Sequence, residues 1–193
     1  MRFGRITQLP GYLALVIITL VAALALGATY TLTEERILEQ SAIEAQNARA
    51  QVMPEAESFE EIPSSDPQIT SVFKALKSAE TIGYVLKTSV NGYGGEIEIV
   101  AGFDMSGTIT GISVGGASFK ETPGLGARSK DPAFTDRFIG KTAPIGVVKA
   151  GQTAGENDVD AIASATITSN AVAGGVNRMA EYVLNLMADG EGA

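Results

Sequence analysis

The longest apolar stretch of the chain lies near its N-terminus. Residues 6–33 carry no charged side chain, and residues 13–32 are mainly Leu, Ala, Val and Ile. A helix needs about 20 predominantly apolar residues to cross the hydrocarbon core of a bilayer. Tyr12 and Tyr30 stand near the two ends of the stretch, where interfacial aromatic residues are common. We therefore expect residues 1–33 to be a short tail followed by a transmembrane anchor.

A cleaved signal peptide is the alternative interpretation, because the small residues of the Ala23–Ala25 segment offer a cleavage site. The apolar region of a signal peptide usually has about 7–15 residues, so the longer stretch here favours a retained anchor. Arg2 and Arg5 precede the stretch, and the acidic pair Glu34-Glu35 follows it. Basic residues favour the cytoplasmic side, which predicts an inside N-terminus and a main domain outside.

A polar segment follows the anchor. Residues 34–52 carry a partial apolar stripe, which predicts a helix that continues from the anchor, and Met53-Pro54 is expected to end it. Residues 54–67 are acidic and rich in Pro and Ser, which is typical of a linker. We assign residues 34–67 to a polar helix and linker, and residues 68–193 to one folded domain.

The folded domain contains both strand and helix patterns. Residues 96–103 and 108–114 read as strands, and the turn at 104–107 ends in Gly and joins them as a hairpin. Near the C-terminus, apolar residues recur at spacings of four, three, four and three, which predicts an amphipathic helix packed on a sheet; they are Val172, Val176, Met179, Val183 and Leu186. The other expected elements are a helix over 69–78, a strand over 82–90, a short helix over 131–139, and strands over 145–149 and 159–162.

The order of these elements is not a strict alternation of strand and helix. It therefore favours the α+β class, with a twisted, mainly antiparallel sheet and packed helices.

The net charge and the missing residue types exclude several classes of function. The net charge is −8 with no basic face in the sequence, which sets nucleic-acid binding aside. The absence of Cys and His removes thiolate catalysis, Cys-ligated clusters, His-ligated haem and a Ser-His-Asp triad.

Small and hydroxyl residues cluster in residues 160–169, at the expected start of the C-terminal helix. Free backbone N–H groups and the helix dipole favour an anion at such a position, so the hydroxyls are candidate neighbours of a phosphate. Ser and Thr also serve commonly as N-caps, and this structural role stays the alternative.

A second segment, residues 121–126, combines a carboxylate with Pro and two glycines. Pro fixes one turn position, and glycine permits backbone angles that are closed to other residues. Such a loop lets a flat ligand approach the backbone, although an ordinary tight turn has the same composition.

Together, in this order, the two segments resemble the FMN-binding family found in the G-type component of Rnf-type electron-transport complexes and the C-type component of sodium-translocating NADH:quinone reductases. The resemblance extends to the anchor, the polar helix and two further motifs, residues 92–95 (Gly-Tyr-Gly-Gly) and 138–141 (Phe-Ile-Gly-Lys). The chain length suits the G-type component of Rnf complexes. The C-type reductase component, an anchored accessory protein without a cofactor, and a hydrolase are the alternatives, and no activating His or Lys supports the last.

The acceptor segment of that family reads roughly Asp-x-x-Ser/Thr-Gly-Ala-Thr-x-Ser/Thr, and its central Thr bonds the FMN phosphate. The resemblance places this covalent phosphoester on Thr166, with Ser164 and Thr168 as rival hydroxyls. Ala163 and Ser164 stand where the family usually has Ser or Thr and then Gly. The expected cofactor-binding residues are Thr166, Ser164, Ala165, Thr168, Asp160, Glu121, Thr122, Gly124, Leu125 and Gly126.

The resemblance implies a subunit that relays electrons within an ion-translocating ferredoxin:NAD oxidoreductase, without a complete catalytic activity of its own. It implies other membrane and peripheral redox subunits as partners, and a magnesium-dependent flavin transferase that uses FAD to attach the FMN. It also implies a bacterial inner membrane, with lipid around the anchor and the FMN domain on the periplasmic side. Asp160 is expected either to help that transferase recognise the segment or to cap the turn.

Overall fold

The computed structural model describes residues 10–149, 152 and 155–190, and it divides into two compact units, Met1–Glu44 and Ala45–Ala193. Helix α1 (Gly11–Val52) supplies the described part of the first unit and the first residues of the second. Its Gly11–Glu34 portion has a mean hydropathy of 2.4 in its most apolar window, none of which is buried. This portion is long and apolar enough to cross a membrane, so the predicted apolar N-terminal helix is confirmed.

The threonines of the apolar portion bond within their own helix. Their hydroxyls donate to carbonyls three or four residues earlier, for example from Thr19 Oγ1 to Leu15 O at 3.0 Å and from Thr29 Oγ1 to Ala25 O at 2.8 Å. Thr31 and Thr33 repeat the pattern. Hydrocarbon offers no hydrogen-bond partner, so these internal bonds make the hydroxyls compatible with a membrane span.

The end of α1 belongs to the folded domain. The helix stops at Val52, before Met53 and Pro54, as the sequence predicts. Val52 is fully buried, and its carbonyl oxygen accepts a hydrogen bond from Thr110 Oγ1 at 2.6 Å. A Cβ on Gly111 would come within 2.9 Å of Val52 Cα, so the absence of a side chain there allows the helix end to approach the sheet closely.

Five antiparallel strands form the main sheet, in the order β1-β2-β3-β4-β5. They are β1 (Ser58–Ile62), β2 (Ile69–Lys77), β3 (Glu80–Asn91), β4 (Glu96–Asp104) and β5 (Ile109–Gly115). The predicted strand over 82–90 and the predicted hairpin around 104–107 are confirmed. In the turn of that hairpin, Asp104 accepts hydrogen bonds from Ser106 and Thr108. Burial raises the pKa of Asp104, but these bonds together outweigh it and bring the pKa below its ordinary value.

Two sequence predictions are wrong in the first part of this sheet. The expected helix over 69–78 is strand β2, and the expected linker over 54–67 contains strand β1. Val72 packs into the core on one face of the sheet, whereas Phe73 and Ala75 pack on the other face against Val52 and Met53. Because both faces are covered, β2 lacks the simple alternation of a half-exposed strand, and its apolar spacing imitates a helix.

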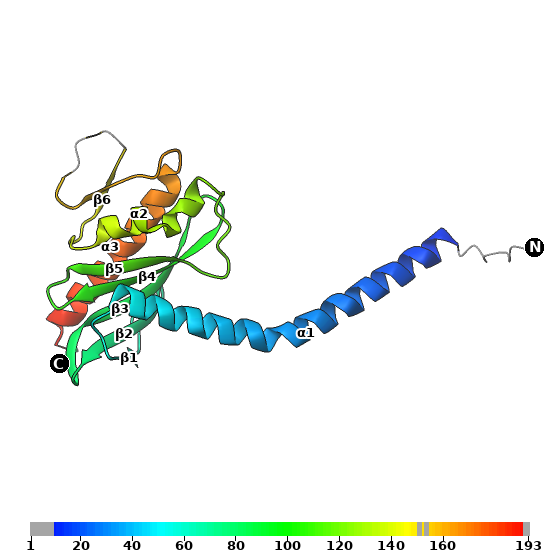
Figure 1. The fold of residues 1–193 in the computed structure, drawn as a ribbon, viewed down its shortest axis with the longest axis horizontal. Helices are drawn as coiled ribbons and strands as arrows, with labels where there is room; N and C mark the ends of the chain where they lie inside the picture. Colours follow the sequence, from blue (N-terminus) through cyan, green and yellow to red (C-terminus); the bar gives the residue numbers. More distant parts are fainter. Residues whose placement is uncertain (1–9, 150–151, 153–154, 191–193) are drawn as a thin grey trace, which may run out of the picture. The chain divides into compact units, whose positions relative to one another are not determined.

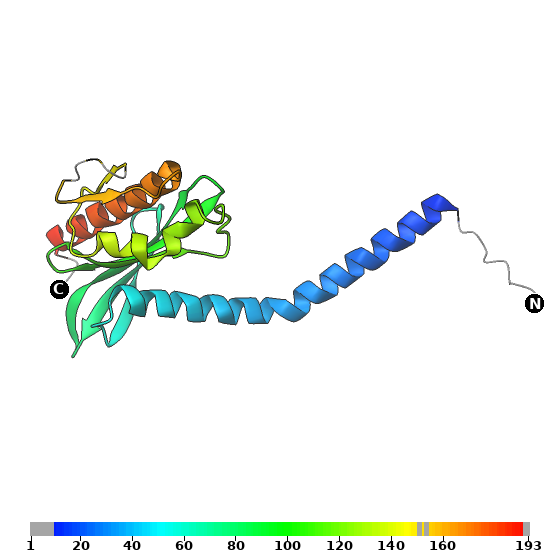
Figure 2. The ribbon, with the colours of Figure 1, turned by 45° about the horizontal axis from the view of Figure 1, so that its top comes forward.

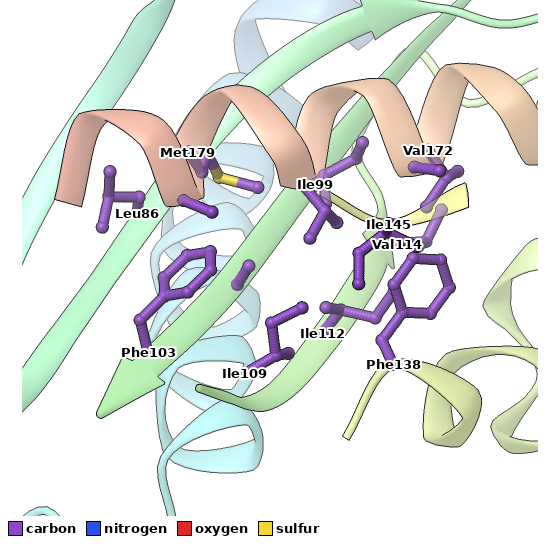
Figure 3. Close-up of a cluster of buried hydrophobic side chains, with 14 of the residues drawn as sticks. Leu86, Ile99, Phe103, Ile109, Ile112, Val114, Phe138, Ile145, Val172 and Met179 are labelled. Atoms are coloured by element: carbon purple, nitrogen blue, oxygen red, sulfur yellow. The ribbon is translucent and has the colours of Figure 1, made fainter. Parts of the chain in front are cut away.

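Helix α3 (Thr166–Ala188) covers the face of the sheet that carries Val72 and runs across the strands (Figures 1 and 2). The predicted amphipathic stripe is confirmed, because its five apolar residues are all buried. Figure 3 shows Met179 of α3 on the side of Leu86 and Phe103 of the strands, and Val172 of α3 on the side of Val114 and Ile145. The start of α3 is thereby held in place by the core of the domain.

Shorter elements complete the domain between β5 and α3. They are η1 (Gly126–Lys130), α2 (Pro132–Thr135), η2 (Asp136–Phe138), and the parallel pair β6 (Gly146–Val148) and β7 (Asp158–Asp160). The expected helix over 131–139 is a single α-turn followed by a 3₁₀ turn, and the expected strands over 145–149 and 159–162 are the shorter β6 and β7. The Asn177 side chain ties α3 to this layer by bonding the Ile145 N–H and carbonyl at 2.7 and 3.0 Å. The predicted α+β class with a mainly antiparallel sheet is confirmed.

Candidate functional site

The two segments singled out in the sequence meet at one pocket. It has a volume of about 410 Å³, within the usual range for a cofactor site. We call it the α3 pocket. Three stretches distant in sequence form it: the β3–β4 loop, the loop after residue 120, and the first turn of α3. The lining residues are Tyr93, Glu121, Thr122, Leu125, Gly126, Ser164, Ala165, Thr166, Ile167 and Thr168.

Glu121 joins all three walls of this pocket. Its side chain is only 6% exposed. One carboxylate oxygen accepts hydrogen bonds from the backbone N–H groups of Tyr93 and Gly94 at 2.8 and 3.0 Å, and the other accepts from Thr168 Oγ1 at 3.0 Å. We call these contacts the Glu121 network. A buried carboxylate requires such partners, so Glu121 acts first as the element that holds the walls together.

Gly126 is required by the same network. A Cβ at this position would overlap the Glu121 carboxylate and lie 2.8 Å from Thr168 Oγ1. Any larger residue would therefore displace the carboxylate from its partners. Gly124 has a different role: it does not line the pocket, and its φ of +78° shapes the turn that carries Leu125.

The hydroxyl residues at the start of α3 separate into two pairs. Thr168 and Ser169 are buried, and Ser169 Oγ accepts from the Ile162 N–H and donates to the Ala165 carbonyl, both at 3.0 Å. Ser164 and Thr166 are exposed and line the pocket. The buried pair holds the chain in place, which leaves the exposed pair as the hydroxyls available for chemistry.

The N-terminus of α3 is open to an anion. Thr166 is its first residue, the preceding Ala165 offers no side-chain cap, and the first turn contains no acidic residue. The first N–H groups of a helix have no partner within the helix, and the helix dipole adds partial positive charge there. A phosphate bound at this helix end would therefore meet backbone donors without competition from a capping side chain.

Ser164 departs from ordinary backbone geometry. Its φ is +60°, in the left-handed region that favours glycine. The family resemblance also places Gly at this position. Ser164 lies in the turn that precedes Thr166, the first residue of α3.

The pocket also has apolar lining residues. Tyr93, Leu125 and Ile167 line it with exposed fractions of 72%, 40% and 58%, so part of their surface is open to a ligand. An uncapped helix terminus with hydroxyls, together with exposed apolar side chains in the same pocket, fits a ligand that joins a phosphate to a flat, weakly polar ring. The residues of this pocket therefore fit FMN.

Asp160 lies outside the α3 pocket. It borders a second depression of about 210 Å³, which we call the charged depression, lined by Arg128, Asp131, Ala133, Phe134, Arg137, Asp160, Ala161, Ile162 and Ala163. Arg137 Nη1 donates to the Asp160 carbonyl oxygen at 2.8 Å. The Asp160 carboxylate is exposed and makes no hydrogen bond to any described residue, so the geometry gives no support to its expected role as a turn cap.

The sequence prediction missed three residues of this site. Tyr93 was noted only as part of the Gly-Tyr-Gly-Gly motif, and an aromatic residue inside a glycine-rich loop is a signal that could have identified it. Ile167 stands among small residues, and the identity of a single isoleucine does not indicate whether its side chain is exposed. Ser169 has the same residue type as its exposed neighbours, so only burial distinguishes its structural role.

Comparison with known proteins agrees with this geometry. The FMN-binding domain family matches residues 92–181, which contain every wall of the α3 pocket. The G-type component of the Na(+)-translocating ferredoxin:NAD(+) oxidoreductase complex of Acetobacterium woodii is 35% identical over 190 residues, covering 90% of this chain and 90% of that protein. The G-type component of the ion-translocating oxidoreductase complex of Methanosarcina acetivorans is 32% identical over 176 residues, covering 88% and 90%.

A solved structure shows the same fold. The chain is similar to NqrC of Shewanella oneidensis with a TM-score of 0.54 and 20% identity, covering 72% of this chain and 74% of that one. At this identity the likeness concerns the fold alone, whereas the curated relatives match over nearly the whole chain. By its sequence, its fold and its matched domain, the chain belongs to the FMN-binding family of G-type components of ion-translocating, Rnf-type oxidoreductase complexes.

Proposed function

We propose that this subunit carries FMN through a phosphoester bond to Thr166 Oγ1 and relays electrons within a membrane-bound, ion-translocating oxidoreductase complex. The observation that carries the proposal is the position of Thr166. It is the first residue of α3, its hydroxyl lines a pocket of suitable size, and the helix end beside it has no side-chain cap. Ser164 also lines the pocket but precedes the helix, and Thr168 is engaged with Glu121.

The attachment is a phosphoryl transfer from FAD. The Thr166 oxygen forms a bond to the flavin-side phosphorus, the pyrophosphate bond breaks, and AMP leaves with the electron pair of that bond. The hydroxyl proton passes to a base. Glu121 is the one carboxylate among the lining residues, and both of its oxygens already accept hydrogen bonds from other groups. The described residues also contain no cluster of acidic metal ligands, so a separate, magnesium-dependent flavin transferase is proposed to supply the base and the metal.

A covalent link suits this pocket. Its large apolar lining residues are widely exposed, so reversible binding would have little buried surface to offset the entropy lost on association. Once FMN is bound, it supplies reversible acceptance of one or two electrons. The residues of this chain would hold the phosphate at the helix terminus, and the exposed apolar lining would leave the ring accessible to a redox partner.

The membrane anchor determines where the FMN-binding domain is located. The apolar portion of α1 and the membrane-complex relatives indicate a single-pass anchor. We propose that the N-terminus faces the cytoplasm and the FMN domain lies on the outer, periplasmic side, supported by the basic tail that precedes the span. A cysteine introduced at exposed Glu96 tests this, because the native chain has none. Labelling of intact cells by a membrane-impermeant maleimide is expected, and labelling only after lysis would contradict the orientation.

The attachment is tested by the intact mass of the full chain, co-expressed with a flavin transferase. The wild type is expected to gain the mass of FMN minus water. Thr166→Val keeps the side-chain shape and removes the hydroxyl, so the adduct should disappear completely. Ser164→Gly and Thr168→Val remove the rival hydroxyls and should keep it. An adduct on Thr166→Val would refute the assignment, and a wild type that never carries one would leave a cofactor-free accessory subunit.

The place in a complex has its own test. Purification of the full chain from its native membrane in mild detergent is expected to bring other redox subunits with it, as the names of the relatives indicate for those proteins. A chain that is always isolated alone, even after mild cross-linking, would contradict the proposed assembly.

A further inference from the structure

One aromatic side chain borders the α3 pocket among the residues that the structure describes. Tyr93, in the loop between β3 and β4, lines the pocket and is 72% exposed. The other apolar lining residues, Leu125, Ala165 and Ile167, are aliphatic. An aromatic ring buries about 150–250 Å² when it is covered, and aromatic rings favour offset stacking on other flat rings. The exposed Tyr93 ring therefore has a large surface available for a flat ligand in this pocket.

The backbone of Tyr93 is fixed even though its ring is exposed. Its N–H donates to a Glu121 carboxylate oxygen at 2.8 Å, and the next N–H, from Gly94, donates to the same oxygen at 3.0 Å. The loop is closed by a hydrogen bond from Gly92 N to Gly95 O at 2.8 Å. A Cβ on Gly94 would overlap the Lys120 carbonyl, so the loop lies directly against the segment that carries Glu121.

The same carboxylate also contacts the helix that carries the flavin acceptor. Its second oxygen accepts from Thr168 Oγ1 at 3.0 Å, and Thr168 lies two residues after Thr166. The Glu121 network thus connects the position of the Tyr93 backbone to the position of the acceptor through a single buried side chain. A group held this tightly from both sides, beside an open pocket, is typical of a wall that positions a ligand.

We propose that Tyr93 is the aromatic wall of the flavin site, stacking on the isoalloxazine ring of the FMN carried by Thr166, and that Glu121 is the positioning residue that sets its location. The inference rests on the function proposed above and extends it from the phosphate to the ring. It also assigns Glu121 a role apart from cofactor contact: its two oxygens are directed to protein donors rather than left free for the ligand.

The test uses flavin fluorescence of the full, flavinylated chain in detergent. A tyrosine in contact with an excited flavin donates an electron to it and quenches its emission, whereas phenylalanine is a much poorer donor. Tyr93→Phe and Tyr93→Leu are therefore expected to raise the emission several-fold at equal flavin content. Tyr93 is largely exposed, so neither change should disturb folding.

A matched control is Tyr182→Phe, a tyrosine on the same helix as the acceptor. It lies sixteen residues after Thr166, which corresponds to about 24 Å along an α-helix, too far for contact quenching. Its loss should leave the emission unchanged. If the Tyr93 variants keep wild-type emission while their masses show the FMN adduct, the proposed stacking of Tyr93 on the flavin ring is wrong. The proposed attachment of FMN to the chain is unaffected by that result. If the wild type carries no adduct, both proposals fail.

The positioning role of Glu121 has a separate readout. Glu121→Ala removes the acceptor for the Tyr93 and Gly94 N–H groups, so emission should rise toward that of Tyr93→Leu even though Tyr93 is present. Glu121→Gln keeps one carbonyl oxygen for these donors and should restore most of the quenching. Equal emission from Glu121→Ala and the wild type, with the adduct intact, would overturn the positioning role.

Discussion

The α3 pocket and the charged depression lie on either side of one short segment, and their linings differ sharply. Ala161, Ile162 and Ala163 line the charged depression, whereas every residue from Ser164 to Thr168 lines the α3 pocket. The change of side occurs where Ser164 takes its left-handed conformation. One side carries two arginines and two aspartates, and the other carries hydroxyls and apolar side chains around a single buried carboxylate.

This comparison separates two roles within what reads as one motif. Thr166, the proposed acceptor, lines the α3 pocket, whereas Asp160 borders the charged depression. The two sets of lining residues divide at the turn that contains Ser164. We therefore expect substitutions on the two sides to affect different measurements.

The largest effect on stability is expected from Glu121→Ala, on the α3 pocket side. The change removes three hydrogen bonds to a buried carboxylate and leaves the donors without their partner. Bonds to a charged group each contribute about 1.5–3 kcal/mol, with losses that are not additive, so a total of about 3 kcal/mol is expected. For a chain of this size that corresponds to roughly 6–12 °C in Tm, measured by thermal unfolding of the full chain in detergent.

Glu96→Ala is the control, because Glu96 is exposed at the start of β4 and makes no hydrogen bond through its side chain to any described residue. Its Tm should stay within about 2 °C of the wild type. A Glu121→Ala variant as stable as Glu96→Ala would show that the network contributes nothing to the walls of the pocket.

Ser164→Gly is expected to stabilise the chain. A left-handed conformation costs a residue with a Cβ about 1 kcal/mol relative to glycine, and Ser164 makes no side-chain hydrogen bond within the described structure that the change would lose. Glycine adds freedom to the unfolded chain, which reduces the gain, so a Tm rise of roughly 1–3 °C is expected. Ala163→Gly, at a neighbour without positive φ, should lower Tm instead. A decrease for both would contradict the strain at Ser164.

On the side of the charged depression, Arg137→Ala removes one hydrogen bond at an exposed site. The bond to the Asp160 carbonyl oxygen is 2.8 Å long, and a loss of about 0.5–1 kcal/mol is expected. Arg137→Lys keeps a hydrogen-bond donor and should recover part of the lost free energy of unfolding. Thermal unfolding again measures the change. A loss of stability as large as that of Glu121→Ala would contradict the expected difference between the charged depression and the α3 pocket.

The smallest effect on stability is expected from Asp160→Asn, because the carboxylate is exposed and has no partner among the described residues. Tm should remain within about 1 °C of the wild type. The rate of FMN attachment by a purified transferase, followed by intact mass at limiting enzyme, should fall. A change in Tm without a change in the rate of attachment would show that Asp160 stabilises the fold and does not take part in recognition by the transferase.

Local patterns were sufficient where the fully buried residues alternate regularly. Ile97, Ile99, Ala101 and Phe103 alternate along β4, and helix α3 buries one side, so the periodicity of both is plain in the sequence. Strand β2 was misread as a helix because Val72 and Ala75 are buried on opposite faces. Strand β1 was misread as a linker because Glu60 and Glu61 make it acidic, which suits an exposed edge strand as well as a loop.

The sequence alone was sufficient to nominate the membrane span, the FMN-binding family and the two segments that form the pocket, because each depends on residue types at fixed spacings along the chain. Only the tertiary structure decided which hydroxyls are available. Thr166 and Thr168 differ by two positions, yet one is exposed in the pocket and the other is buried against Glu121. Exposure depends on what folds against a residue, and here the deciding partner comes from 47 residues away.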